Sequence, residues 1–242
     1  MGVRVVAVGR TTSQLEELAA QFGVIPISLD VSDADSVANA VGHVESNWGP
    51  IDLLVNNAAT SGTADAAWLN SPSDWWRVFE VNVLGTYLCC RSILPSMLSR
   101  GKGHIVNVAS GAAHYRVDDA EDLISTAYMA SKAAVIRFSE TLAAEVHASG
   151  VRVFAISPGM VKTEMTSTLF ADIWDVPDIW SPPELTAELV EFIASGAIDG
   201  LSGRFIHART DDWRSFPEQT AKILAEDLNA LRITLPLNSK DE

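Results

Sequence analysis

The sequence has little cysteine, a deficit of positive charge and no long apolar run. Its two cysteines, Cys89 and Cys90, are adjacent, and neighbours that close rarely form a disulfide, so a reducing compartment is expected. Seventeen basic residues against 31 acidic ones give a net charge of −14, which would repel nucleic acid or an anionic bilayer. No apolar stretch reaches the ~18 residues that a membrane-spanning helix needs. We therefore expect a cytoplasmic protein with no nucleic-acid or membrane partner.

Metal ligands and a secretory leader are also missing from the pattern. With cysteine only at 89–90, no histidine stands at the spacing of a zinc site, so no metal is expected. The histidines are His43, His104, His114, His147 and His207. No basic and then apolar leader with a cleavage site precedes Val3, so no secretory signal is predicted.

Short apolar runs alternate with amphipathic segments along all 242 residues. The runs predict strands over 3–8, 24–30, 51–59, 104–110, 151–157 and 203–208. Helical spacing, caps and glycine stops predict helices over 12–22, 33–48, 73–99, 127–149, 184–194 and 217–231. Apolar strands separated by helices are typical of a parallel sheet covered on both faces. The sequence therefore predicts a single α/β domain over 1–242 with a doubly wound parallel sheet.

Polar or conformationally special residues follow five of the predicted strands. They are Gly9-Arg10, Asp30-Val31, Asn56-Asn57-Ala58, Ser110 and Ser157-Pro158-Gly159. In open parallel sheets, ligands bind beyond the carboxyl ends of the strands. We therefore expect the functional site at this edge of the sheet.

Tyr128 and Lys132 lie four residues apart in a predicted helix, so their side chains share one face. An ammonium beside a phenol stabilises the phenolate and lowers the pKa of tyrosine from about 10 toward neutrality. Such a tyrosine can exchange a proton with a substrate oxygen. The same spacing is also common on helix surfaces where the lysine is only solvated.

Two further polar residues stand near the same edge. Ser110 ends a predicted strand, where its hydroxyl could hydrogen-bond a substrate carbonyl, although turn and cap serines are also common there. Asn82 lies among apolar residues in the middle of a predicted helix, where asparagine is intrinsically unfavourable. A buried amide needs partners, so either a structural hydrogen bond or an active-site relay must account for it.

Together these segments resemble the classical short-chain dehydrogenase/reductase family. The residues that carry the resemblance are "NNAA" at 56–59, "NVLG" at 82–85, Ser110, "YMASK" at 128–132 and "SPGMVKT" at 157–163. They occur in the order of the family over nearly the whole chain. The resemblance implies a Rossmann-type fold and hydride transfer between a nicotinamide coenzyme and a small carbonyl or alcohol substrate.

The resemblance also implies roles for the catalytic residues. Tyr128 would be the general acid/base, and Lys132 would lower the pKa of Tyr128 and hold the nicotinamide ribose. Ser110 would orient the substrate oxygen. Asn82 would support a water-linked proton relay.

Further residues are expected to contact the coenzyme, in addition to Tyr128 and Lys132. By resemblance, Asn56 and Ala58 would line the adenosine half, Asp30 would contact the adenine edge and Thr163 would meet the carboxamide. Val31, Pro158 and Gly159 stand at the same edge and are further candidates.

The end of the first predicted strand bears on the choice of coenzyme. Relatives that select NAD carry an acidic residue where Gly9 stands, to hold the ribose 2′-hydroxyl. Gly9-Arg10 offers instead a guanidinium suited to a 2′-phosphate. We therefore expect NADP(H) rather than NAD(H), the alternative being that Arg10 is a simple turn residue.

One family element has no counterpart in this sequence. Members begin with a strand, a T-G-x-x-x-G-x-G turn and a helix, and no glycines here have that spacing. We therefore expect that the first β-α unit is missing. That unit supplies the N–H groups that hold the pyrophosphate, and its strand lies in the middle of the sheet. Its loss would leave two strand edges unpaired or force an unusual direct pairing.

The interval between Ser110 and Tyr128 is longer than in typical members of the family. The additional residues predict a loop at the mouth of the site, in which His114 and Tyr115 could reach a substrate. The loop also carries an acidic run, interpreted as solvated or, alternatively, as disfavouring anionic substrates. This run is Asp118, Asp119, Glu121 and Asp122.

The segment 164–183 stands where the family has its mobile substrate-binding loop. Its apolar and aromatic residues predict a hydrophobic carbonyl compound rather than a sugar, with ordinary packing as the alternative for most of them. They are Met165, Leu169, Phe170, Ile173, Trp174, Ile179 and Trp180.

The predicted helix around Asn82 is apolar on nearly all sides. This pattern predicts burial by the sheet and by another helix, and the family commonly forms dimers or tetramers through this region. We therefore expect a homodimer or homotetramer. The apolar residues are Trp75, Trp76, Val78, Phe79, Val81, Val83, Leu84 and Tyr87.

Three functions compete at this point. The first is an NADP-linked carbonyl/alcohol oxidoreductase. The second is a catalytically inactive binding or oligomer subunit of the same fold that has lost coenzyme binding. The third is a related enzyme that uses a Tyr-Lys pair on nucleotide sugars, which the absence of a longer C-terminal substrate domain disfavours.

Overall fold

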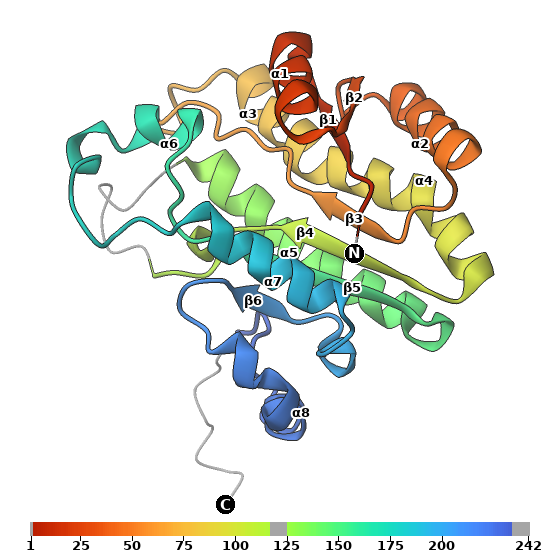
Figure 1. Cartoon of the computed structure of the whole chain (residues 1–242). Helices are drawn as coiled ribbons and strands as arrows, with labels where there is room; N and C mark the ends of the chain where they lie inside the picture. Colours follow the sequence, from red (N-terminus) through yellow and green to blue (C-terminus); the bar gives the residue numbers. More distant parts are fainter. Residues whose placement is uncertain (1, 117–124, 234–242) are drawn as a thin grey trace, which may run out of the picture.

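The computed structural model describes residues 2–116 and 125–233. Parallel strands lie between layers of helices (Figure 1). The strands are β1 (Val6–Gly9), β2 (Ile25–Ser28), β3 (Leu53–Asn56), β4 (Gly103–Val108), β5 (Val151–Ser157) and β6 (Phe205–His207). The α-helices are α1 (Thr12–Phe22), α2 (Ala34–Trp48), α3 (Pro72–Phe79), α4 (Gly85–Arg100), α5 (Thr126–Val146), α6 (Glu164–Leu169), α7 (Pro183–Ala194) and α8 (Phe216–Ala225). The predicted α/β class with parallel strands is confirmed.

The strands of the described residues form two parallel sheets rather than one. Strands β3, β4, β5 and β6 pair in that order, and β1 pairs separately with β2. No hydrogen-bonded ladder within the described residues joins β1 to β3. Val8 on β1 is 45% exposed and Val55 on β3 is 39% exposed. Of the two arrangements expected without a central strand, the described residues adopt the one with unpaired edges.

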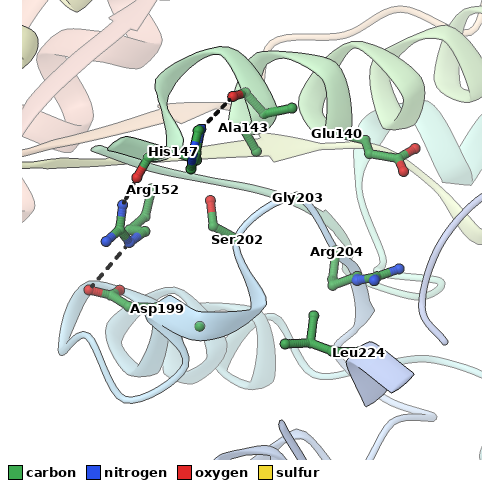
Figure 2. Close-up of a pocket in the computed structure, with 11 residues that line it drawn as sticks. Glu140, Ala143, His147, Arg152, Asp199, Ser202, Gly203, Arg204 and Leu224 are labelled. Carbon is green, nitrogen blue, oxygen red and sulfur yellow. Dashed lines mark hydrogen bonds and ion pairs between the residues drawn. The ribbon is translucent and has the colours of Figure 1, made fainter. Parts of the chain in front are cut away.

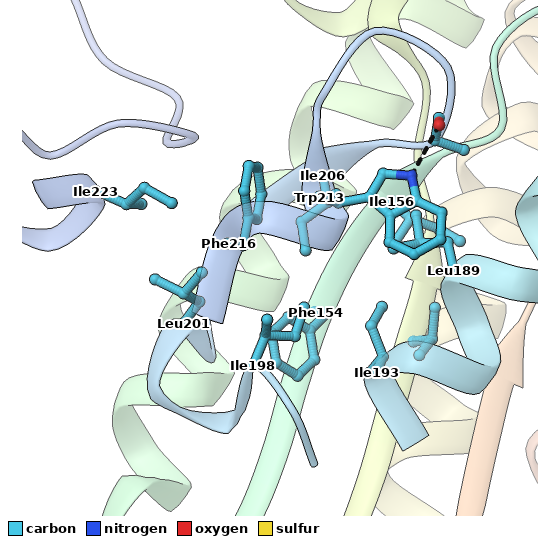
Figure 3. Packing of buried hydrophobic residues seen from close by; sticks show 12 residues of the cluster. Phe154, Ile156, Leu189, Ile193, Ile198, Leu201, Ile206, Trp213, Phe216 and Ile223 are labelled. Carbon is cyan, nitrogen blue, oxygen red and sulfur yellow. Dashed lines mark hydrogen bonds between the residues drawn. The ribbon is translucent and has the colours of Figure 1, made fainter. Parts of the chain in front are cut away.

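The two faces of the four-stranded sheet carry separate hydrophobic clusters. Because side chains alternate along a strand, Val153 packs with helices α4 and α5 while its neighbour Phe154 packs with α7 and α8. Figure 3 shows Phe154 and Ile156 of β5 beside Leu189 and Ile193 of α7. These four side chains are fully buried. Burial on both faces explains the continuously apolar strand sequence.

The long helix predicted over 73–99 is interrupted. A π-helical turn, Glu80–Leu84, separates α3 from α4. Pro95 lies within α4, which continues to Arg100. A π-turn changes the direction in which the following side chains point, and such turns are frequent at functional sites. The sequence spacing alone carries no signal for this insertion.

The helix around Asn82 is less enclosed than its apolar sequence predicts. Val78 and Asn82 are buried, but Trp76, Leu84 and Tyr87 are exposed. Within the single chain only part of this helix is buried, and the predicted cover of its remaining surface by another helix stays a prediction. One face of the α3–α4 region presents large apolar side chains to solvent.

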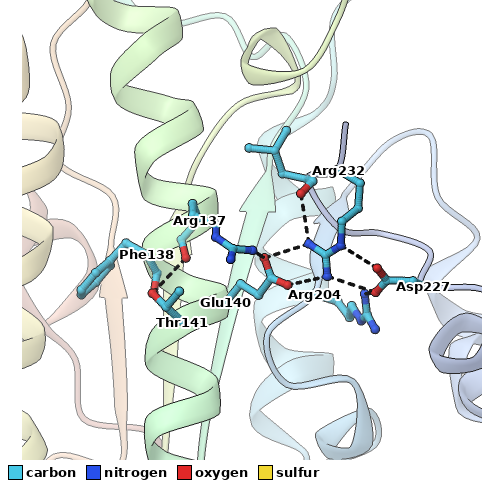
Figure 4. A network of polar contacts seen from close by, with 8 residues as sticks. Arg137, Phe138, Glu140, Thr141, Arg204, Asp227 and Arg232 are labelled. Atoms are coloured by element: carbon cyan, nitrogen blue, oxygen red, sulfur yellow. Dashed lines mark hydrogen bonds and ion pairs between the residues drawn. The ribbon is translucent and has the colours of Figure 1, made fainter. Parts of the chain in front are cut away.

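The last predicted helix is shorter than expected, and an ionic network follows it. Helix α8 ends at Ala225, and Asp227 and Asn229 adopt left-handed backbone conformations. Arg232 pairs with both Asp227 and Glu140 of α5 (Figure 4). A network of charges can contribute stability where an isolated surface pair contributes little. This network attaches the C-terminal part of the described chain to α5.

None of the described helices is long and apolar enough to span a membrane. Likewise, within residues 2–116 and 125–233, no group of three or more histidine, cysteine or acidic side chains is arranged to hold a metal ion.

We predict that truncating Phe154 is costly because its whole side chain is buried. Phe154→Ala should lower the free energy of unfolding by about 3–5 kcal/mol, through lost burial and a residual cavity. The matched control is Phe22→Ala, since Phe22 on α1 is 64% exposed and should change stability by less than ~0.5 kcal/mol. Urea unfolding followed by circular dichroism measures both. Equal losses would contradict the assignment of β5 to the core.

Candidate active site

Two predicted catalytic hydroxyls meet at the carboxyl edge of β4. Tyr128 lies in the first turn of α5, where the N-cap residue Ser125 accepts a hydrogen bond from its backbone N–H. An interaction with the Ser110 side chain lowers the pKa of the Tyr128 phenol, so the two hydroxyl groups lie near each other. The Ser110 hydroxyl oxygen also accepts the Ala112 N–H at 3.2 Å. The two residues are therefore held together by a strand end and a helix start that are distant in sequence.

The pKa of Tyr128 is raised above its ordinary value, contrary to the prediction. Burial disfavours the phenolate and outweighs the hydrogen bond from Ser110, which acts in the opposite direction. The Lys132 ammonium lies 5.7 Å from the centre of the Tyr128 ring. It donates instead to the Val108 carbonyl at 2.6 Å. In the protein alone, Tyr128 therefore remains a protonated phenol at neutral pH.

Lys132 is itself strongly affected by its surroundings. Only 2% of the residue is exposed, and burial lowers the pKa of its ammonium to about 8. The Val108 carbonyl satisfies one of its three N–H donors. A cation close to its titration range thus lies one helical turn from the phenol.

The Asn82 side chain is fully engaged in structural hydrogen bonds. Its amide oxygen accepts the Thr60 N–H at 2.9 Å, and its amide nitrogen donates to the Thr60 carbonyl at 3.0 Å and to Ser131 Oγ at 2.9 Å. Its backbone carbonyl accepts the Thr86 hydroxyl at 2.8 Å. Asn82 thereby connects the loop after β3 to helix α5 through hydrogen bonds. Its role in a proton relay stays a prediction.

Ser131 was not singled out by sequence reasoning, although it lies inside the "YMASK" segment. Its hydroxyl accepts from Asn82 and donates to the Tyr128 carbonyl at 2.7 Å. The residue is fully buried. Ser131 therefore connects the π-turn to the first turns of α5.

Asp30 lies where the adenine contact was predicted, and it already has partners. Burial alone would raise the pKa of its carboxyl, but hydrogen bonds from the Ser32 hydroxyl and backbone, and the Arg77 guanidinium, lower it to about 2. Arg77 also donates to Ser32 Oγ at 2.8 Å and pairs with Glu80. Arg77, on α3, was missed because nothing local in the sequence indicates a partner 47 residues away.

The remaining adenosine-side candidates divide between the interior and the surface. The Asn56 amide donates to Asn107 at 2.8 Å, and Asn107 in turn donates to Ser139. The Asn56 side chain thus belongs to a polar network beneath the edge, whereas Ala58 is exposed at the edge. Val31 packs so closely on Gly85 that a Cβ there would lie 2.7 Å from it.

Gly9 and Arg10 form the turn between β1 and α1. The Ser28 hydroxyl donates to the Arg10 carbonyl at 3.3 Å, and the Thr12 hydroxyl donates to Ser28 at 3.3 Å. The Arg10 side chain is exposed. The end of β1 therefore presents an exposed arginine whose backbone lies beside the Ser28 hydroxyl.

The segment after β5 is shaped by Gly159 and capped by Thr163. Gly159 has a φ of +77°, and a Cβ would lie 2.3 Å from Ser181 Oγ, so only glycine fits this position. Thr163 and Thr166 form a capping box at the start of α6. Thr163 is exposed at the surface.

The predicted substrate segment packs around a lysine. The Lys162 ammonium lies 4.8 Å from the Trp174 ring and 5.5 Å from the Trp180 ring. The Arg209 guanidinium donates to the carbonyls of Asp178 and Ile179. Neither Lys162 nor Arg209 was identified from the sequence. Lys162 follows β5 and Arg209 follows β6, so both connect the segment to the carboxyl edge of the sheet.

Residues around the predicted loop mouth lie beside a second group of rings. His114 contacts Phe205, with ring centres 5.1 Å apart, and also Tyr115 at 4.9 Å. Burial lowers the pKa of His114. A cavity of about 360 Å³ lies between these residues, His207 and Arg232. The acidic residues Asp118, Asp119, Glu121 and Asp122 lie outside the described residues.

Another cavity, of about 370 Å³, opens at the opposite end of α5 (Figure 2). Its lining includes Arg152, which donates to the His147 carbonyl at 3.3 Å and lies 4.0 Å from Asp199. None of the predicted site residues lines it. The candidate active site is therefore the carboxyl edge around Ser110 and Tyr128.

Comparisons with known proteins identify the family of this chain. The family model described as short chain dehydrogenase matches residues 1–174. The chain is 37% identical to a protein named "Short chain dehydrogenase mpl6" from Monascus purpureus, over 78% of this chain and 62% of that protein. It is 40% identical to the D-threitol dehydrogenase of Mycolicibacterium smegmatis, over 84% and 80% of the two chains. This chain thus spans less than two thirds of the fungal relative.

Among solved structures, the L-sorbose reductase of Gluconobacter frateurii, complexed with NADPH and L-sorbose, superposes with a TM-score of 0.73. It is 28% identical and the match covers 85% of both chains.

We predict that Arg77 is responsible for part of the low pKa of Asp30. Because the folded-state pKa lies below 3.8, ionised Asp30 stabilises the fold above about pH 4, and this contribution is lost as the pH falls toward 2. In Arg77→Gln the carboxyl should titrate at a higher pH, measured by NMR of the Asp30 side chain. Arg137→Gln is the control, because Arg137 pairs with Glu140 instead. An unchanged Asp30 titration in Arg77→Gln would refute the assignment.

Proposed function

This chain belongs to the short-chain dehydrogenase family, and on that premise we propose that it is an NADP-linked oxidoreductase acting on a carbonyl or alcohol. The observation that carries the proposal is the proximity of Tyr128 and Ser110 at one strand end, with buried Lys132 one turn along α5. These groups gather at the carboxyl edge of the sheet, where such folds bind their ligands.

The residues at this edge suit the two ends of a nicotinamide coenzyme. Trp180 Nε1 and Ser181 Oγ are buried beside the turn after β5 and have no hydrogen-bond partner within the described residues. Orphaned donors of this kind are available to a bound polar group. On the adenosine side, Arg10, Asp30, Val31, Asn56 and Ala58 are proposed to line the site. Pro158, Gly159 and Thr163, with Tyr128 and Lys132, are proposed for the nicotinamide side.

When bound, the coenzyme supplies or accepts the hydride, and the protein manages the proton. In carbonyl reduction, the protonated Tyr128 hydroxyl would donate its proton to the substrate oxygen as negative charge develops there. The Ser110 hydroxyl would hydrogen-bond the same oxygen, since the Ala112 N–H occupies one lone pair of Ser110 and helps to orient it. The raised pKa of Tyr128 keeps the phenol in its proton-donating form.

The preference for NADP over NAD rests on Arg10. Arg10 is exposed just before the N-terminus of α1, and its backbone carbonyl accepts the Ser28 hydroxyl. Both the charge and the N–H groups of the helix start favour a 2′-phosphate. No carboxylate stands at Gly9 to favour an unmodified ribose.

The substrate is proposed to be an apolar carbonyl or alcohol. Trp174 and Trp180 in segment 164–183 pack together with ring centres 5.0 Å apart, and we expect this aromatic pair to face the substrate. Aromatic side chains in a ligand site favour apolar groups over a heavily hydroxylated ligand. Because some similar proteins are named for a sugar or a polyol, polyols should be assayed beside the apolar compounds.

The protein is also proposed to act in the cytoplasm as a homodimer or homotetramer. Trp76, Leu84 and Tyr87 are exposed on the α3–α4 region. Large apolar groups gathered on one face are favourable contacts for a second copy.

We predict that Tyr128→Phe abolishes turnover while leaving NADPH binding largely intact. The hydroxyl that transfers the proton is lost, whereas the ring remains, so kcat/KM should fall on the order of 100-fold or more. The assay follows the loss of NADPH absorbance with panels of apolar ketones, aldehydes and polyols. Binding is followed by NADPH fluorescence.

Tyr87→Phe is the matched control, because Tyr87 lies on α4 against Phe138, away from Ser110. A wild-type chain that neither consumes nor binds NADPH would favour the inactive-subunit alternative. A Tyr128→Phe variant with full activity would refute the proposed chemistry.

We predict that Arg10→Gln weakens NADPH binding about tenfold, or ~1.4 kcal/mol, and changes NADH binding by less than about twofold. The reason is that only NADPH carries the phosphate that a guanidinium can pair with. Fluorescence titrations with both coenzymes measure the ratio. Arg4→Gln is the control, since Arg4 donates to the Trp48 carbonyl instead. Equal losses for both coenzymes would exclude a 2′-phosphate contact.

A further inference from the structure

Ser157 is a buried serine that lies between two parts of the site. Neither the proposed chemistry nor the sequence motifs give it a role. Ser157 is the last residue of β5 and is only 2% exposed. Its hydroxyl oxygen accepts the Gly111 N–H at 3.1 Å and the Gly159 N–H at 3.3 Å. One side chain thus joins the turn after β4 to the turn after β5.

Neither turn has another way to satisfy these groups. Among the hydrogen bonds of the described residues, no other acceptor serves the N–H of Gly111 or of Gly159. A Cβ on Gly111 would lie 2.6 Å from the Tyr115 ring, and one on Gly159 would meet Ser181. Each glycine therefore has no room for a side chain, and its N–H has Ser157 Oγ as its acceptor. A buried N–H left without an acceptor is costly.

Ser157 is itself rigidly placed. Its carbonyl accepts the Ala208 N–H at 2.8 Å, and it is in register with His207 on β6. The backbone of Ser157 is thus fixed by the sheet, and its hydroxyl oxygen is a fixed point for both turns.

The two turns carry different halves of the proposed chemistry. Gly111 follows Ser110, which lies near Tyr128 and acts on its pKa. Gly159 opens the segment that runs to Thr163, proposed for the nicotinamide side. The spacing between these turns sets how a substrate oxygen at Ser110 and Tyr128 lies relative to a ring held by the 158–163 segment.

We propose that Ser157 is a positioning residue that couples the Ser110 turn to the Pro158–Gly159 turn and so aligns substrate with coenzyme. This proposal rests on the proposed function. Misalignment of reacting atoms by about 1 Å can cost on the order of 100-fold in rate. Loss of the shared acceptor leaves both turns attached to their strands. The rate is therefore expected to fall by less than that factor.

The test compares Ser157→Ala with Ser202→Ala in the full chain. Ser202 Oγ accepts the Val153 N–H at 2.9 Å, so the control removes a similar hydrogen bond to the same strand, β5, away from Ser110 and Tyr128. In Ser157→Ala, kcat should fall about tenfold with KM for the carbonyl substrate changed less than about twofold. Ser202→Ala should keep its kcat, although its thermal midpoint falls by a similar amount.

A second measurement does not depend on turnover. Amide hydrogen exchange followed by NMR should show the Gly111 and Gly159 amides exchanging about tenfold faster in Ser157→Ala only. Unchanged exchange at both amides, or a kcat equal to that of Ser202→Ala, would overturn the proposal. If the wild-type chain turns over no substrate, the proposed function fails, and the exchange rates still decide whether Ser157 couples the two turns.

Discussion

Backbone N–H groups that leave the end of a buried strand need new acceptors, and this requirement shapes the whole carboxyl edge of the molecule. Side chains supply several of these acceptors. Asp30 receives the Ser32 N–H after β2, Asn82 receives that of Thr60 after β3, and Ser110 receives that of Ala112 after β4. Ser157 accepts two such groups after β5. The residues that hold the loops and the residues proposed for chemistry are therefore largely the same set.

Burial then determines the charge states of the central groups. It raises the pKa of Tyr128 and lowers that of Lys132 to about 8, in both cases because the charged form is poorly solvated. The two effects together favour a neutral phenol and a more weakly held ammonium proton. An ammonium alone, at its distance from the ring, does not reverse this. A bound anionic or polar ligand beside Lys132 would shift the balance by restoring favourable interactions for the cation.

The sequence predicted those parts of the molecule that depend on local pattern. The parallel α/β class and the alternation of strands and helices follow from periodicity, whereas the shared role of Ser110 and Tyr128 was implied by the family resemblance. The π-turn around Asn82 was not predicted, because it changes helical phase without changing residue type. Arg77 and Ser157 were not assigned roles, since their partners are distant in sequence or are backbone atoms. The net pKa shift of Tyr128 was predicted in the wrong direction, because spacing reports proximity and not burial.

The division of the strands into two sheets places a particular demand on the helices. Arg10 and Asp30 belong to the β1–β2 unit, whereas Ser110, Tyr128 and Lys132 belong to the four-stranded sheet. A ligand that spans both units requires their relative position to be held without a ladder between β1 and β3. Arg77 of α3 pairs with Asp30, and Val31 packs directly on Gly85 at the start of α4. The π-turn Glu80–Leu84 lies between these two contacts and carries Asn82, which is hydrogen-bonded to Ser131 of α5. The α3–α4 region therefore contacts both α5 and the residues that follow β2.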